Sequence, residues 1–327
     1  MPAYPSFHRV PLLVAAAACW GVGTVITKQV LVDVAPPTLL PIQLLASCAF
    51  LFLLSHASRT RITWSPPMRR LAALGVLNPG LAYALGLLGL TSMSAGMSVL
   101  LWATEPVLIV VLAILLLREH VPATLVAMMA VAVLGALLVV YQPGASGSGT
   151  GVALTVAAVT ACALYTVLVR RLLLDDASVS VALVQQSAAL GFAVLLAGLV
   201  QAMAGDALAA WSVSPQTWLA AAVSGVLYYG LAFWSYLAGL QHVSASVAGS
   251  FITLVPVFGV GAGYLAGERL TAQQWLGAVV VIIAIAVVAV QQSTPDDARS
   301  QPAPGQPHQD ACEREERQAG GSRDGIR

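Results

Sequence analysis

The sequence predicts an all-α integral membrane protein in which ten transmembrane helices form two inverted-topology repeats of five helices each. Composition is the first observation behind this prediction. The 327 residues are 58% hydrophobic and 9% charged, and the mean hydropathy is +0.85. A soluble domain has about 25% charged residues, so most of this chain is expected to face lipid. The other two observations are a series of apolar segments and an internal repeat.

Ten segments are long and apolar enough to span a bilayer, which takes about 20 mostly apolar residues. Links that carry charged residues, proline or glycine separate most of them. The predicted spans are 11–32, 36–56, 70–91, 94–117, 122–141, 150–171, 178–201, 216–240, 244–266 and 271–291. Residues 1–10 form a short N-terminus, and the polar composition of 292–327 predicts a disordered tail.

Basic residues predict the orientation of the spans, because Lys and Arg gather on the cytoplasmic side of a membrane. If the N-terminus is inside, only Lys28 and Arg269 of the basic residues between the spans lie outside. The inner side then holds Arg9, Arg59, Arg61, Arg69, Arg70, Arg118, Arg170 and Arg171. We therefore expect a multi-pass protein of the inner (plasma) membrane, with its N- and C-termini in the cytoplasm.

An internal repeat relates the two halves of the chain. When residues 72–107 are shifted by 150 positions, 14 of the 36 residues are identical, and several glycines and a proline stay in register. The first two spans repeat with a shift of 142, which pairs Lys28 with Arg170. The fifth spans align with a shift near 149, which pairs Glu119 with Glu268.

The repeat predicts that the two halves have opposite orientations. Each repeat, 11–141 and 150–291, holds five predicted spans, so the second copy enters the membrane from the other side. Inverted-topology repeats are a recurring architecture of transporters, in which the substrate site lies near the midplane between the halves. A duplicated bundle without a cavity is the structural alternative.

Short motifs accompany the repeat in a fixed order. The first repeat contains Cys19-Trp20-Gly21, Ser94-Ala95, Glu105-Pro106-Val107 and Leu117-Arg118-Glu119. The second contains Ser244-Ala245, Pro256-Val257 and Leu265-Ala266-Gly267-Glu268-Arg269-Leu270-Thr271. Over residues 11–291 the chain resembles the EamA-type, ten-helix members of the drug/metabolite transporter superfamily.

This resemblance implies a secondary transporter that moves a small metabolite, amino acid or drug-like molecule by alternating access, as an exporter. Coupling to protons is one mechanism that would drive such export. Many members carry an arginine near position 43, where this chain has Gln43. A central positive charge is therefore missing, and the resemblance does not imply an anionic substrate.

Glu105 is the only acidic residue deep within a predicted span. A charge at that depth is costly, so its carboxylate needs a cavity, a partner or a proton. We expect it to couple transport to protons or to bind a substrate amine; a hydrogen bond to a neighbouring helix is the alternative. Ser98 and Trp102 share its predicted helix face. Pro106 and its repeat counterpart Pro256 are expected hinges, although membrane helices also tolerate packed prolines.

Polar and aromatic side chains complete the predicted substrate site. The repeat pairs Gln43 with Gln185, and Gln186 lies beside the second copy. Ser250 and Thr253 continue a polar stripe in the ninth span. All of these side chains would bind a polar substrate or else join helices, at about 0.6 kcal/mol each. Aromatic residues far from the predicted interfaces indicate a cavity suited to amphipathic or cationic ligands, with core packing as the alternative. They are Trp20, Tyr83, Trp102, Tyr165, Tyr229, Trp234 and Phe251.

Residue types argue against several other functions. The net charge of +1 provides no basic footprint for nucleic acid. The four cysteines lack metal-ligand spacing, so no metal or cofactor is predicted. There is no Walker A motif for ATP and no pairing of histidine with a nucleophile at depth, so no catalytic residue is predicted. The expected partners are a small-molecule substrate, the lipid bilayer and protons. A non-transporting scaffold or receptor and an intramembrane enzyme remain the alternatives.

Overall fold

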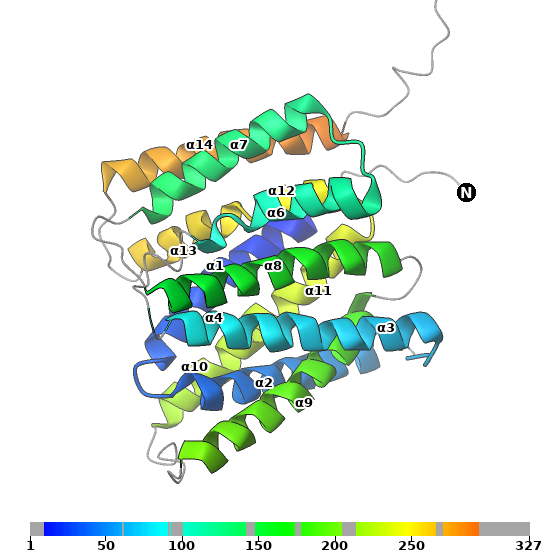
Figure 1. Ribbon diagram of the computed structural model, residues 1–327, viewed down its shortest axis with the longest axis vertical. Coiled ribbons are helices and arrows are strands. Elements are labelled where there is room, and N and C mark those ends of the chain that lie inside the picture. The colour runs from blue at the N-terminus through cyan, green and yellow to red at the C-terminus, as the bar shows by residue number, and fades with distance from the viewer. Residues whose placement is uncertain are drawn as a thin grey trace, which may run out of the picture. The chain divides into compact units, whose positions relative to one another are not determined.

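Every regular element in the described part of the chain is a helix (Figure 1). The structure, a computed structural model, describes residues 10–60, 62–90, 92, 101–141, 148–173, 178–204, 214–265 and 271–293. The fold lies within the unit Met1–Gln292. Most of the predicted N-terminus, 1–10, and of the predicted tail, 292–327, lies outside the described residues.

The first repeat begins with two long helices, α1 (Val10–Val30) and α2 (Pro36–Ala57). Next come α3 (Pro66–Gly75), the π-helical segment η2 (Val76–Leu81) and α4 (Ala82–Leu90), which are continuous. The repeat ends with α6 (Glu105–Leu112), the π-helical segment η3 (Ala113–Leu117) and α7 (Ala123–Val140).

The second repeat follows the same order of elements. It begins with α8 (Gly149–Leu172) and α9 (Ser178–Ala204), followed by α10 (Pro215–Gly225), the π-helical segment η5 (Val226–Leu231) and α11 (Ala232–Leu240). It ends with α12 (Ala245–Phe251), α13 (Leu254–Leu265) and α14 (Ala272–Ser293). The segments η2 and η5 therefore occupy corresponding places in the two repeats.

Serine caps fix where several helices begin. The hydroxyl oxygens of Ser65, Ser148, Ser214 and Ser244 each accept a hydrogen bond from the backbone N–H three residues later. Such a bond satisfies one of the free N–H groups of a first helical turn. At the C-terminal end of η3, Arg118 adopts a left-handed conformation (φ 54°), which ends the helix.

Proline residues make three predicted spans less regular than expected. Asn78 interrupts the span 70–91 with extended backbone angles (φ −146°, ψ 122°), because the ring of Pro79 disfavours helical geometry at the preceding residue. A turn at 252–253 divides the predicted span 244–266 into α12 and α13. A turn at 103–104 likewise precedes Glu105 and Pro106, so Trp102 and Glu105 belong to separate helical segments.

Eight helical segments of the described chain are long and apolar enough to cross a membrane. They are Val10–Val30, Pro36–Ala57, Ala123–Val140, Gly149–Leu172, Ser178–Met203, Pro215–Leu240, Ala245–Leu265 and Ala272–Gln291. Glu105–Leu117 is a shorter apolar helix, and the predicted fourth span that contains it is described only in part. The two expected spans not among the eight are therefore the third and the fourth.

Helices of the two repeats interleave in the bundle. α1 contacts α11, η5 and α13, while α2 packs on α9 and α10, and α4 packs on α8. Figure 1 shows α7 beside α14 at one edge of the bundle, where the side-chain nitrogen of Gln273 donates to the backbone oxygen of Leu138 at 3.0 Å. Most long-range packing therefore joins one repeat to the other.

Two glycines bring the repeats into backbone contact. A Cβ atom added to Gly75 of α3 would lie 2.6 Å from the Cα atom of Gln185 in α9. A Cβ atom added to Gly225 of α10 would lie 2.6 Å from the Cα atom of Gln43 in α2. The sequence repeat pairs Gly75 with Gly225 and Gln43 with Gln185, so the two contacts are reciprocal. Only glycine allows backbones to approach this closely.

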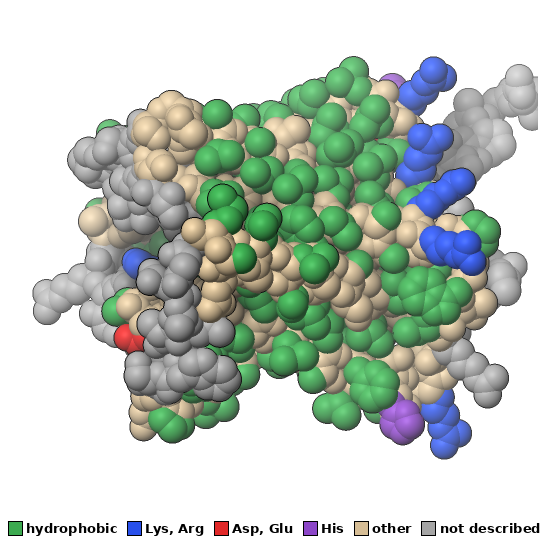
Figure 2. Space-filling view, turned by 60° about the horizontal axis from the view of Figure 1, so that its bottom comes forward, with side chains coloured by type: hydrophobic (Ala, Val, Ile, Leu, Met, Phe, Trp, Pro, Cys, Tyr) green, Lys and Arg blue, Asp and Glu red, His purple; other side chains and the backbone are tan. Residues whose placement is uncertain are grey.

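The outer surface of the bundle is apolar. Large exposed hydrophobic side chains project from α7, α9 and α14, including Leu134, Leu195, Leu199, Leu276 and Ile283. Figure 2 shows a broad field of hydrophobic side chains on one face, with Lys and Arg side chains gathered mainly at one end. An exposed apolar surface of this extent is suited to contact with lipid.

Candidate functional site

A central cavity of about 520 Å³ lies between the two repeats. Its lining comes from α1, α2, η2, α4, α6 and α7 of the first repeat and from α8, η5, α11, α13 and α14 of the second. Binding pockets for small molecules have volumes of roughly 300–1,000 Å³. The cavity is therefore large enough to hold a small organic molecule.

Aromatic rings form much of the cavity wall. Tyr83 stacks on Trp102 with ring centroids 5.8 Å apart, and its edge contacts Tyr228 at 5.6 Å and Tyr229 at 5.5 Å. The hydroxyl of Tyr83 donates a hydrogen bond to that of Tyr228 at 3.1 Å. Trp20 packs against Tyr236 at 5.2 Å. These contacts join α1, α4, η5 and α11 in one aromatic wall.

A few polar groups interrupt this wall. Glu105 begins α6 directly before Pro106, and both residues line the cavity. Among the described residues, no hydrogen bond or ion pair holds the Glu105 carboxylate. The indole nitrogen of Trp20 and the side-chain oxygen of Asn78 are buried in the lining and have no partner in the described chain. The cavity thus presents one carboxyl group, one free donor and one free acceptor.

Gln43 differs from these groups because its amide is already bound. Its nitrogen donates to the hydroxyl oxygen of Thr27 at 2.9 Å and to that of Ser224 at 2.8 Å. Gln43 is buried, and it joins α2 to α1 and to α10 across the two repeats. Within the cavity wall, Gln43 therefore holds α2 to these two helices.

The structure brings most of the predicted site residues together. The predicted residues that line the cavity are Trp20, Gln43, Tyr83, Trp102, Glu105, Tyr165, Tyr229 and Thr253, together with the predicted hinges Pro106 and Pro256. Their roles in binding stay predictions. Ser98 and the motif residues Ser94, Ala95 and Glu268 lie outside the described residues.

Five predicted site residues are placed elsewhere, and one of them, Phe251, is buried in the hydrophobic core. Gln185 is buried beside the cavity, where its side-chain oxygen accepts a hydrogen bond from Tyr165 at 2.7 Å. Gln186 is fully buried, and its amide has no partner in the described chain. Ser250 donates to the backbone oxygen of Val247 at 2.7 Å, and Trp234 packs against the hydrophobic core. None of the five is part of the cavity lining.

Several lining residues were not predicted. They include Asn78, Cys162, Thr166, Tyr228, Phe233 and Tyr236. Helical spacing from Tyr229 would have indicated two of them, because Phe233 and Tyr236 lie four and seven residues further on. Trp234, which was predicted instead, is displaced from that face by one residue.

Among the described residues, one end of the cavity is open and the other is closed. The lining extends to the end of the bundle where Lys28, Pro36 and Gln274 lie, and Lys28 is exposed there. We call this the open end. At the other end, Leu125, Leu173, Val243 and Val247 belong to a continuous hydrophobic cluster. We call this the closed end.

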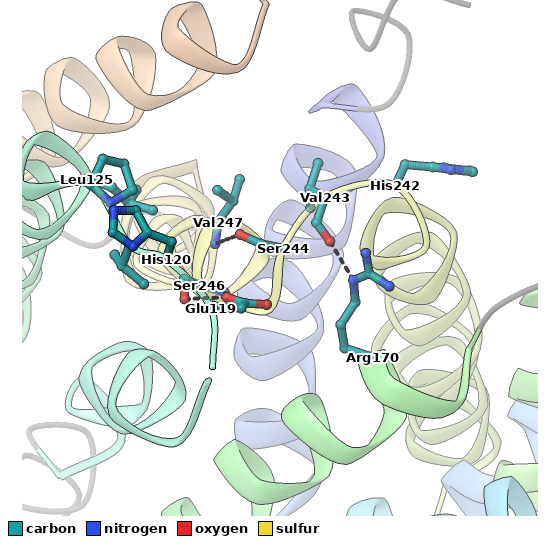
Figure 3. Close-up of a pocket in the computed structure, with 11 residues that line it drawn as sticks. Glu119, His120, Leu125, Arg170, His242, Val243, Ser244, Ser246 and Val247 are labelled. Atoms are coloured by element: carbon teal, nitrogen blue, oxygen red, sulfur yellow. Dashed lines mark hydrogen bonds between the residues drawn. The ribbon is translucent and has the colours of Figure 1, made fainter. Parts of the chain in front are cut away.

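Hydrogen bonds across the repeats reinforce the closed end (Figure 3). The Glu119 carboxylate accepts bonds from the backbone N–H of Ala245 at 2.8 Å and of Ser246 at 3.2 Å, and from the Ser246 hydroxyl at 2.6 Å. The carboxylate thereby caps α12, and an anion at a helix N-terminus is favourable. Within the second repeat, Arg170 donates from its Nε atom to the backbone oxygen of Val243 at 2.8 Å.

The hydrogen-bonded residues of the closed end, Glu119, Arg170, Val243 and Ser246, line a separate hollow of about 480 Å³. The hollow shares no lining residue with the central cavity, so buried side chains separate the two. In the sequence Arg170 indicated only the orientation of the spans and a repeat partner for Lys28, but in the structure it contacts the loop before α12. The sequence therefore underestimated its structural role.

An all-helical bundle with an apolar exterior and a cavity between two internal repeats is a multi-pass membrane protein of transporter type. The sequence profile of the EamA-like transporter family matches residues 9–141 and 149–290. The chain belongs to this family, which is part of the drug/metabolite transporter superfamily.

Comparison with solved structures supports the fold. Among them is one titled "Crystal structure of protein", which has a TM-score of 0.74 and 18% sequence identity, and the match covers 87% of this chain and 99% of that chain. At this identity the likeness concerns the fold alone. Among curated proteins, none matches the sequence.

Proposed function

We propose that the chain is a secondary transporter that exports a small organic molecule by alternating access. The central cavity carries the proposal: both repeats line it, aromatic and polar side chains face it, and among the described residues it is open at one end and closed at the other. A molecule bound there would leave by the opposite end once the closed-end contacts break and the open end closes. A protein that only packs helices together does not need such a cavity.

We propose an architecture of ten spans in two inverted repeats. The protein would lie in the inner (plasma) membrane, with both termini in the cytoplasm. The reciprocal contacts of Gly75 with Gln185 and of Gly225 with Gln43 support a two-fold relation between the repeats. The basic residues of the closed end support its placement on the cytoplasmic side. They include Arg118 and Arg170.

In this proposal the lining residues bind the substrate, and Glu105 also exchanges the coupling proton. Pro106 and Pro256 lie in the first turns of α6 and α13, directly after each break, and this position supports a role as hinges. Gln185 supports the site indirectly through its hydrogen bond with Tyr165. Gln186, Ser250 and Trp234 have no contact with the cavity that would support a binding role.

Transport measurements test the proposed function. The purified protein, reconstituted in liposomes, is given a panel of amino acids, small amines and drug-like molecules under an imposed pH gradient. We expect at least one solute to move in a gradient-dependent way and Glu105→Gln to abolish that dependence. Failure of every solute to move, together with unchanged resistance of cells that overexpress Glu105→Gln, would contradict the proposal.

Labelling of single cysteines tests the proposed topology. The four native cysteines are first replaced by alanine, and one cysteine is then introduced at Asp33, Arg69, Arg118 or Gln274. With a membrane-impermeant reagent on intact cells, we expect labelling at Asp33 and Gln274 but not at Arg69 or Arg118. Placement of Arg69 and Arg118 on different sides of the membrane would overturn the inverted arrangement.

A further inference from the structure

We propose that the central cavity binds a monovalent organic cation with an aromatic or bulky apolar body. This inference rests on the proposed function, because it names the substrate class of the same cavity. Three independent features of the lining support it: the balance of charged groups, the aromatic wall, and the free polar atoms.

The charged groups of the lining favour a cation. Glu105 is the one acidic side chain among the described lining residues, and Lys28 is the one basic side chain. Lys28 is exposed at the open end, where water can solvate its charge. Glu105 shares the cavity lining with Tyr83, Trp102 and Tyr229 and, within the described chain, has no hydrogen bond or ion pair. A carboxylate removed from water needs a partner, and a positively charged ligand would supply it.

The charge of the ligand follows from the asymmetry of the repeat. At the position that corresponds to Glu105, the second repeat has Val255, which also lines the cavity. The two glutamines related by the repeat are neutral, and both have hydrogen-bond partners. One carboxylate without a symmetric counterpart matches a single positive charge. An anion would meet this carboxylate without a buried arginine or lysine to offset it.

The aromatic wall provides a second attraction for a cation. Tyr83, Trp102, Tyr228 and Tyr229 form a connected group with ring centroids 5.0–5.8 Å apart. Trp102 and Glu105 are separated only by the short turn at 103–104. A cation within about 6 Å of a ring centroid is attracted by the electron-rich ring face. The same rings would pack against the apolar body of the ligand.

The free polar atoms indicate what else the ligand carries. The indole N–H of Trp20 is a donor without a partner, and the side-chain oxygen of Asn78 is an acceptor without a partner, among the described residues. Trp20 is 9% exposed and Asn78 is 5% exposed, so neither group has ready access to bulk water. A ligand with one hydrogen-bond acceptor and one donor, in addition to its cationic nitrogen, would satisfy both.

Equilibrium binding to the purified full chain in nanodiscs tests the proposal without requiring transport. The probes are phenyltrimethylammonium, its neutral isostere tert-butylbenzene and the anion benzoate, and the readout is quenching of tryptophan fluorescence. We expect saturable binding of phenyltrimethylammonium with an affinity at least tenfold higher than that of either other probe. Equal affinity for the three probes, or tighter binding of benzoate, would overturn the proposal.

Variants assign the effect to the cavity. Glu105→Gln should weaken binding of phenyltrimethylammonium at least tenfold. Asp33→Asn is the matched control, because it changes the net charge equally but Asp33 is not part of the lining, and it should bind like the unmodified chain. Trp102→Leu tests the aromatic wall if Glu105→Gln does not fold, and it should weaken binding of the cation at least fivefold. Unchanged affinity in a folded Glu105→Gln or Trp102→Leu variant would count against the proposal.

The binding result and the transport result can be told apart. Cation-selective binding without movement of any solute in liposomes would contradict the proposed function but support the ligand class. Gradient-dependent movement of a neutral or anionic solute, with no selectivity for phenyltrimethylammonium, would support transport and overturn the ligand class.

Discussion

The two ends of the central cavity are built from corresponding parts of the repeats, yet they differ. At the closed end Arg170 donates a hydrogen bond to Val243, and Glu119 caps α12. At the open end Lys28, the repeat counterpart of Arg170, is exposed and has no hydrogen bond or ion pair in the described chain. Glu268, the counterpart of Glu119, lies outside the described residues. A sequence repeat therefore does not require both ends of the cavity to make the same contacts at the same time.

The largest expected effect comes from removal of the Glu119 carboxylate. Glu119→Ala leaves the N–H groups of Ala245 and Ser246 without their acceptor, and bonds to a charged group contribute about 1.5–3 kcal/mol each. Because Glu119 is partly exposed, we expect a total loss of about 2–3 kcal/mol and a closed end that opens more readily. The melting temperature and the labelling rate of a cysteine introduced at Val247 measure these effects.

Glu119→Gln is the matched control for that prediction. Its amide oxygen can still accept one or two of the three hydrogen bonds, so it should lose about half as much stability. If Glu119→Ala left both the melting temperature and the labelling rate unchanged, the cap would not hold the closed end.

The second prediction concerns the backbone contacts that the repeats share. In Gly75→Ala and Gly225→Ala, each added Cβ atom overlaps the backbone of the facing glutamine, and overpacking costs about 1–3 kcal/mol. We expect losses of similar size at the two sites, measured as the free energy of unfolding in detergent. Gly191→Ala is the control, since its Cβ atom meets nothing within 4 Å, and it should not destabilise the fold. Tolerance at only one site would show that the contacts are not equivalent.

The third prediction compares Arg170 with Lys28 directly. Arg170→Ala removes the partly buried bond to Val243 and should lower stability by about 1 kcal/mol. Lys28→Ala removes an exposed side chain without such a bond, and its effect should stay within roughly 0.5 kcal/mol. Thermal unfolding of the two variants in the same detergent provides the measurement. Equal losses would mean that Lys28 makes contacts equivalent to those of Arg170.

The smallest expected effect is at the aromatic wall. Tyr83→Phe removes the hydrogen bond to Tyr228 but keeps the ring contacts with Trp102 and Tyr229. A typical hydrogen bond contributes about 0.5–1.5 kcal/mol, and we expect a loss near the lower value. Cysteine labelling at both ends should stay unchanged. A large change in labelling at either end would mean that this bond is coupled to the opening of the cavity.

Composition, apolar segments and the repeat were enough to predict the helical class, and the ordered motifs indicated the family. Most of the predicted site residues lie in the cavity wall, but most residues of that wall were not predicted. Pro106 and Pro256 marked where two helices break, but Pro79, whose ring disfavours helical geometry at Asn78, was not singled out as a break. The prediction of Trp234 in place of Phe233 and Tyr236 came from treating each aromatic separately rather than by helical spacing. The bond between Glu119 and Ala245 joins residues 126 positions apart, and nothing in a single sequence specifies such a pairing.

The reciprocal glycine contacts have a consequence for how the fold can assemble. A single repeat contains both members of the pair, the glycine that allows close approach and the glutamine backbone that it meets. A surface of this kind is self-complementary, as in a symmetric dimer whose subunits present the same patch to each other. Two separate copies of either half therefore have the groups needed to associate through these contacts. The link at 142–148 joins one first half to one second half in a single molecule.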